Sequence, residues 1–244
     1  MARMNARGSS REVETLTACS YLKGENGNEL VTIAVEGSDR EYCVQQAILC
    51  GLSENFSRAL SGTYKEAKTR TLVLPGCDIN TLELFLRWTT CRELPNYRQA
   101  SESFDKGSNE LFNFTTTTQL QLIRLWTFAD MILIPKLQND SLQAINDMTA
   151  FTRAETIELI FATTVVCSTL QNYALDCFLS GHRLPTDYGP KRYSDQDFDR
   201  IGATPGVMLA CFKLTEMSRC GSLYCECDPC CYAVYEAEDY MVPE

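Results

Sequence analysis

The stretch Tyr42–Pro75, YCVQQAILCGLSENFSRALSGTYKEAKTRTLVLP, decides the fold of this chain. It begins with strand-like residues, continues through two apolar segments with helical spacing, and returns to a strand at Thr71–Leu74. Ser53 is predicted to cap the second helix, because its hydroxyl can accept a hydrogen bond from a free amide. Ser61 and Gly62 are predicted to end that helix, since glycine tolerates the left-handed conformation. The residues between this helix and the last strand are predicted to form a polar turn.

The residues on either side extend this pattern. Leu30–Val35 is β-branched and alternating, and the turn at 36–39 predicts a hairpin with Arg40–Val44. Asn80 and Glu83 have the spacing of a capping box, which predicts the start of a helix. We therefore expect an α+β fold in which a small sheet is followed by helices.

The second half of the chain is predicted to be helical. Thr118–Met131 is apolar on most sides, which is typical of a buried helix, and Pro135 suits the first position of the next one. One or two further helices are expected within 152–179, and a short one at Val207–Met217. The polar interval 95–116 is predicted to be a disordered insertion.

These motifs together resemble a BTB/POZ domain, and the chain as a whole is similar to fungal BTB proteins. The resemblance continues from the opening stretch through Leu82–Leu94 (LELFLRWTTCREL) and Gln119–Ile145 (QLQLIRLWTFADMILIPKLQNDSLQAI). It implies the BTB/POZ fold, a small three-stranded sheet flanked by helical hairpins, with a C-terminal helical extension. The chain departs from the family at Val44–Gln46, where the family has VHK, and at Thr89–Arg92, where it has LYTG.

The resemblance also predicts how the chain is divided. Residues 181–206 are linker-like, because they are rich in glycine, proline and polar side chains. The expected parts are a flexible N-terminal arm at 1–26, the BTB/POZ domain at 27–150 with its insertion at 95–116, a helical back extension at 151–180, and a linker, short helix and Cys-rich tail at 181–244.

A protein-interaction function is what the resemblance implies. The chain would self-associate, act as an adaptor, or both, with a second copy and a cullin scaffold of a ubiquitin ligase as expected partners. Cullin-binding members use a hydrophobic-x-Glu motif after the second helix, and Tyr64, Lys65 and Glu66 stand at that place. An aromatic anchor beside a charge concentrates interface energy. The alternative, a tyrosine packed on its own domain with a solvated Glu66, stays open at this point.

Charge and composition disfavour other partners. The chain has 32 acidic against 22 basic residues and a formal net charge of −10, whereas phosphate binding needs clustered Lys and Arg. We therefore expect no nucleic acid or membrane partner. No apolar run has the length of a signal peptide core or a membrane span, so a cytoplasmic or nuclear location is expected.

The sequence gives no reason to predict an enzyme. His182 is the single histidine, and no nucleophile elbow or glycine-rich phosphate loop accompanies it. We therefore expect no catalytic residues and no cofactor.

The Cys-rich tail offers a second hypothesis, a metal-binding regulatory protein. Cys220, Cys225, Cys227 and Cys230 lie close together in RCGSLYCECDPCCY. The two-residue spacing of Cys227 and Cys230 lets both sulfurs reach one zinc ion, and the other two would complete a tetrahedral set. A structural zinc site usually combines two such pairs, whereas this tail has one, so reduced thiols without metal are the alternative.

Overall fold

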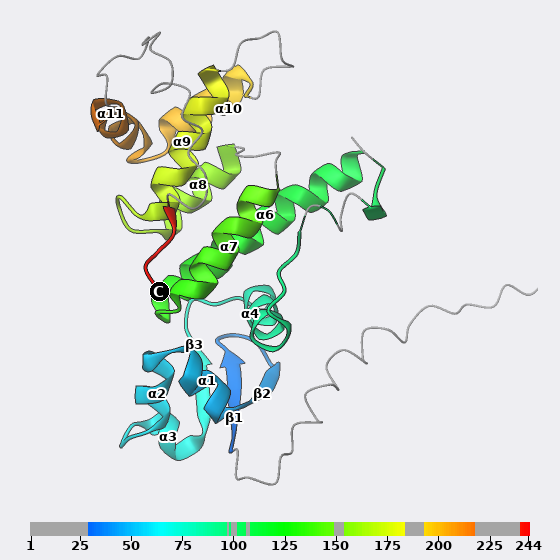
Figure 1. Ribbon diagram of the computed structural model, residues 1–244, viewed down its shortest axis with the longest axis vertical. Coiled ribbons are helices and arrows are strands. Elements are labelled where there is room, and N and C mark those ends of the chain that lie inside the picture. The colour runs from blue at the N-terminus through cyan, green and yellow to red at the C-terminus, as the bar shows by residue number, and fades with distance from the viewer. Residues whose placement is uncertain are drawn as a thin grey trace, which may run out of the picture. The chain divides into compact units, whose positions relative to one another are not determined.

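The computed structural model describes residues 29–96, 98, 102–105, 108–148, 154–183, 193–217 and 240–244. They form a three-stranded mixed sheet and about ten helices, so the fold class is α+β as expected (Figure 1). The chain divides into two compact units, Met1–Asp78 and Ile79–Glu244. Among the helices of the described residues, none is long and apolar enough to cross a membrane.

The sheet of the first unit has the strand order β2-β1-β3. Strand β1 (Leu30–Val35) pairs antiparallel with β2 (Glu41–Gln45), which confirms the predicted hairpin. It pairs parallel with β3 (Thr71–Leu74) on its other side. Gly37 has a φ of 79°, and the Ser38 amide donates to the Val35 carbonyl at 3.1 Å, so the hairpin turn uses a conformation that favours glycine.

The core of the first unit lies on one face of this sheet. Alternate residues of β1 and β3 are buried, and the pair of helices that joins β2 to β3 adds further buried side chains. These helices are α1 (Gln46–Leu52) and α2 (Glu54–Leu60). The buried apolar residues of the sheet and this helix pair are Val31, Ile33, Val35, Leu49, Phe56, Leu60, Leu72 and Leu74.

The local predictions for this helix pair are confirmed in part. The Ser53 hydroxyl accepts a hydrogen bond from the Asn55 amide at 3.1 Å, so Ser53 caps α2 as expected. Helix α2 ends at Leu60, as predicted, but the predicted left-handed glycine at Gly62 is wrong. Ser61 is the capping residue, and Gly62 is not among the residues with positive φ.

The predicted polar turn contains a short helix, α3 (Lys65–Thr69). Lysine, glutamate and alanine have high helix propensity, and their run in this segment explains the helix. Arg70 ends it in the left-handed conformation with a φ of 54°. The Arg70 carbonyl then accepts from the Thr32 amide at 2.9 Å, so the end of α3 is joined directly to β1.

The second unit begins with three packed helices, α4 (Ile79–Cys91), α6 (Asn109–Met131) and α7 (Pro135–Asp147). Pro135 occupies the first turn of α7, as predicted. The start of α4 differs from the prediction, because the helix begins at Ile79 and Asn80 lies inside its first turn. Buried side chains such as Leu82, Phe85, Leu122 and Leu137 form the core between these helices.

Helix α6 starts nine residues earlier than the expected Thr118. The Ser108 hydroxyl accepts from the Leu111 amide at 3.1 Å, and this cap starts the helix within the interval predicted to be disordered. Leu111 and Thr115 are buried, and the Thr115 hydroxyl donates to the Leu111 carbonyl. The prediction of disorder over 95–116 is therefore wrong for residues 109–116, because the threonine-rich polar composition hid a buried face.

The described part of the second unit contains four further helices: α8 (Ala154–Thr163), α9 (Thr169–Arg183), α10 (Asp195–Ala203) and α11 (Val207–Met217). The predicted helices at 152–179 and 207–217 are confirmed. These four elements share one core cluster, whose buried residues are Ala154, Ile157, Leu175, Phe178, Tyr193, Ile201 and Val207.

Helix α10 lies in the segment that was predicted to be a linker. Ser194 and Asp197 form a capping box, in which the Asp197 carboxylate accepts from the Ser194 amide at 2.9 Å. Tyr193 and Ile201 are buried, so this segment contributes to the core cluster. The linker assignment is therefore wrong for residues 193–206.

The remaining parts of the predicted division stay predictions. The expected N-terminal arm, 1–26, and most of the Cys-rich tail lie outside the described residues.

Candidate functional site

The candidate partner-binding residues Tyr64, Lys65 and Glu66 lie at the start of α3 in the first unit. Tyr64 is the residue before the helix, with extended backbone angles (φ −63°, ψ 159°). Lys65 is exposed and Glu66 is partly exposed in the first helical turn. The three side chains therefore share one short surface element.

Tyr64 is one of the exposed large hydrophobic residues of the chain. It is 62% accessible, which is high for a large aromatic residue. A Cβ atom added at Gly62 would lie 3.4 Å from the Tyr64 Cδ2 atom, so a side chain at position 62 would meet the ring. Whether the tyrosine binds a partner stays a prediction.

The base of this element is fixed by Arg70. Its guanidinium forms an ion pair with Glu29 and donates a hydrogen bond to Gln46, in addition to the backbone bond to β1. Among the described residues, Lys65 and Glu66 have no ion-pair partner. The motif therefore offers an exposed aromatic side chain with both signs of charge beside it.

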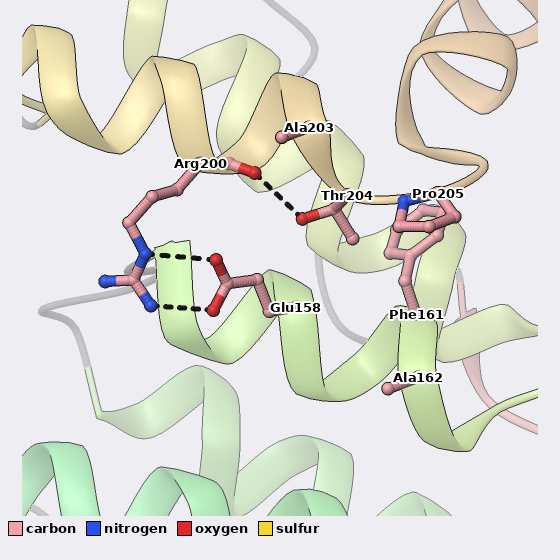
Figure 2. A pocket seen from close by; sticks show the side chains of 7 residues that line it. All are labelled: Glu158, Phe161, Ala162, Arg200, Ala203, Thr204 and Pro205. Atoms are coloured by element: carbon pink, nitrogen blue, oxygen red, sulfur yellow. Dashed lines mark hydrogen bonds and ion pairs between the residues drawn. The ribbon is translucent and has the colours of Figure 1, made fainter.

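A hollow of about 600 Å³ lies between α8 and α10 in the second unit, and sequence reasoning missed it. Figure 2 shows the ion pair of Arg200 and Glu158 on one side of this hollow, and the rings of Phe161 and Pro205 on the other. The remaining lining residues are Ala162, Ala203 and Thr204. Its walls are mainly apolar, which suits an apolar group better than a charged one.

The charged groups of this hollow are already paired. Arg200 donates from Nε and Nη2 to the two Glu158 oxygens at 3.0 and 2.7 Å, and from Nη1 to Glu155 at 3.5 Å. The hydrogen bond with Glu158 raises the pKa of Arg200 further above its usual value. The Thr204 hydroxyl donates to the Arg200 carbonyl at 3.0 Å. An anionic ligand would have to displace these carboxylates from Arg200.

The predicted zinc ligands, Cys220, Cys225, Cys227 and Cys230, lie outside the described residues. Within the described part of the chain, no group of three or more His, Cys, Asp or Glu side chains is placed to hold a metal ion. The zinc hypothesis therefore stays a prediction from the spacing of these cysteines.

One feature of the sequence indicates a helix that forms part of the hollow. The capping-box pattern at Ser194 and Asp197 marks the start of α10, which supplies one wall. Its aspartate stands where glutamate or glutamine is more usual, and the surrounding polar residues resemble a linker. The pairing of Arg200 with α8 depends on tertiary packing and has no local sequence signature.

Comparison of the chain with protein-family models and with curated proteins finds no match.

Proposed function

We propose that this chain is a BTB/POZ-type protein-interaction module that self-associates or acts as an adaptor, and that it is not an enzyme. The proposal starts from the motifs of the opening stretch. It is supported by the element order of the first unit, in which a hairpin is followed by a helix pair and a third strand parallel to the first. The observation that carries it furthest is the exposure of Tyr64 on a fixed element.

The partner surface in this proposal is centred on Tyr64. Because Arg70 ties the end of α3 to Glu29 and to β1, little backbone freedom of this element is lost when a partner covers the tyrosine. An aromatic side chain that enters an apolar pocket with little entropy loss is a typical interface anchor. Glu66 and Lys65 beside it would select a partner with complementary charge.

A cullin-type scaffold is the specific partner we propose, because Tyr64, Lys65 and Glu66 match the hydrophobic-x-Glu motif of cullin-binding BTB proteins. The test is a titration of the full chain with the purified amino-terminal region of a cullin. Replacing an interface anchor by alanine costs about 2 kcal/mol or more, which is about a 30-fold loss of affinity. We expect this loss for Tyr64→Ala and a larger one for the Tyr64→Ala, Glu66→Ala double variant.

The matched control is Lys68→Ala, because Lys68 is an exposed residue of the same helix outside the motif. It should change the dissociation constant by less than about threefold. Equal affinity of the wild type and the double variant would remove the motif from the account, and absence of cullin binding would remove the cullin.

A second proposal applies to the Cys-rich tail, on the observation that Cys227 and Cys230 have the spacing of a zinc-binding pair. Elemental analysis of the purified chain tests it. Stoichiometric zinc that is lost in the Cys227→Ser, Cys230→Ser variant would support a metal-binding regulatory protein. Purified chain without zinc, after growth in zinc-supplemented medium, would contradict it.

A further inference from the structure

Tyr240 and Val242 contact α7 and α9, far from them in the sequence (Figure 1, red). Two separate sets of contacts hold this segment, one to its backbone and one to a tyrosine side chain.

Asn139 of α7 makes the backbone contact. Its Nδ2 atom donates to the Val242 carbonyl at 2.8 Å, and its Oδ1 atom accepts from the Val242 amide at 2.7 Å. One amide side chain thus pairs with both backbone groups of one residue, as a neighbouring residue does in a hydrogen-bonded pair of an antiparallel sheet. Asn139 is 8% exposed, so these bonds lie in a largely buried setting. The contact uses the backbone groups of Val242 and does not involve its side chain.

Tyr240 makes the side-chain contact with α9. Its ring meets the Tyr173 ring edge to face, with centroids 5.4 Å apart and an interplanar angle of 66°. Its hydroxyl donates a hydrogen bond to the Asp176 carboxylate. An aromatic pair of this geometry and a hydrogen bond to a carboxylate are both specific interactions, so this part of the site favours tyrosine.

One receiving side chain, Tyr173, is held in place by another contact. Tyr173 is 2% exposed, and its hydroxyl donates to the Asn146 Oδ1 atom of α7 at 2.7 Å. This bond joins α9 to α7. The Tyr173 ring is therefore positioned by a contact other than those to residues 240–242, as a side chain of a binding site is.

We propose that α7 and α9 form a peptide-recognition site whose occupant is the chain's own C-terminal pentapeptide, Tyr240–Glu244. The site takes a segment with a tyrosine and, two residues later, a residue with a free backbone amide. Proline is excluded at that second position because it has no amide hydrogen. Pro243 and Glu244 are exposed and lie outside the recognised part. This site is independent of the Tyr64 surface.

Attachment to the same chain favours the bound state. A free peptide of the same sequence lacks this advantage, so it should bind only when the resident segment has been removed.

The first test is amide hydrogen exchange at Val242 in the full chain. We expect exchange at least tenfold slower than in the free pentapeptide, because the amide is bonded to Asn139. Asn139→Ala and Tyr240→Ala should both bring the rate to within about twofold of the free peptide, and Glu244→Gln should leave it unchanged. Tyr240→Ala keeps the test valid if Asn139→Ala fails to fold.

The second test uses a chain that ends at Asp239 and the synthetic peptide Tyr-Met-Val-Pro-Glu. We expect saturable shifts of the Asn139 side-chain amide signals, at least tenfold weaker binding of Tyr-Met-Pro-Pro-Glu, and no shifts in the full chain. The proposal would be overturned if the Val242 amide of the wild-type chain exchanged as fast as in the free peptide. It would also be overturned if the two peptides bound with equal affinity. Protection that grows with protein concentration would overturn the assignment to the same chain, because it would show exchange of tails between copies.

Discussion

Cys77 shows how burial controls a single reactive group. Burial, with a smaller contribution from the neighbouring Asp78 carboxylate, raises the pKa of the Cys77 thiol from 9.0 to about 12. At pH 8 a thiol with a pKa of 12 is ionised about a thousandfold less than one with a pKa of 9.0. Because thiolate is the reacting form, Cys77 should be protected from alkylation in the folded chain.

We therefore predict that iodoacetamide at pH 8 labels Cys77 about a thousandfold more slowly in the folded chain than in denaturant. The exposed thiols of Cys43 and Cys167 serve as internal controls that label in both states. As the pH rises, the Cys77 thiol ionises in the unfolded chain before it ionises in the folded chain. Ionisation of Cys77 therefore does not lower the free energy of unfolding below pH 9, and lowers it progressively as the pH rises toward 12. Rapid labelling of folded Cys77 at pH 8 would contradict its burial.

The two tryptophans form a matched pair for testing a buried hydrogen bond. Trp88 is 1% exposed, and its Nε1 atom donates to the Asp140 carboxylate at 2.7 Å. Trp126 is also buried, but its Nε1 atom has no hydrogen-bond partner among the described residues. Hydrogen bonds to charged groups contribute about 1.5–3 kcal/mol.

Replacement by phenylalanine should therefore affect the two sites differently. We predict that Trp88→Phe lowers the free energy of unfolding by about 1.5–3 kcal/mol more than Trp126→Phe does, because only the first change removes an indole hydrogen bond to a carboxylate. Urea denaturation of the two variants measures the difference. Equal losses would mean that the bond between α4 and α7 contributes nothing net.

At the scale of elements, α10 depends on its first residues. The Ser194 hydroxyl accepts from the Asp197 amide at 3.2 Å, and the Asp197 carboxylate accepts from the Ser194 amide. Loss of such a cap typically costs about 1 kcal/mol. We predict this loss for Ser194→Ala in thermal or urea unfolding. Asp195→Asn, which removes only a charge from the first turn, should cost less than half as much, and the reverse order would contradict the role of the capping box.

The elements also show what the sequence could and could not predict. The hairpin, α1, α2, β3, α7 and α11 follow from alternation, helical spacing and turn residues in the sequence. The first two turns of α6 and the whole of α10 were hidden in polar composition. Their buried residues, such as Leu111 and Ile201, are too few to give a periodic signal without a packing partner.

The candidate site divides in the same way. Tyr64, Lys65 and Glu66 were found by resemblance to a motif, and their exposure could only come from the structure. The site for the C-terminal residues had no sequence signal, because Asn139 and Val242 are 103 positions apart and one of them is recognised through its backbone. Such contacts depend on the tertiary arrangement of α7 and α9.

For the whole molecule, the proposed self-association predicts a change of mass with concentration. The chain has a mass of 27.5 kDa. Light scattering during size-exclusion chromatography should therefore give a mass of about twice this value at micromolar concentration if two copies associate. The net charge of −10 opposes association at low ionic strength, so added salt should favour the larger species. A constant mass of 27.5 kDa up to high concentration would contradict self-association, and only the proposed adaptor role would remain.

The most direct measurement of the central claim is quantitative affinity capture of partners from cells that express the tagged chain. Wild type should enrich a defined set of proteins, a cullin among them, and Tyr64→Ala should reduce their recovery about tenfold or more. Val73→Ala, which alters another exposed apolar residue of the first unit, should retain them. The same partners recovered at the same level with Tyr64→Ala would contradict the account.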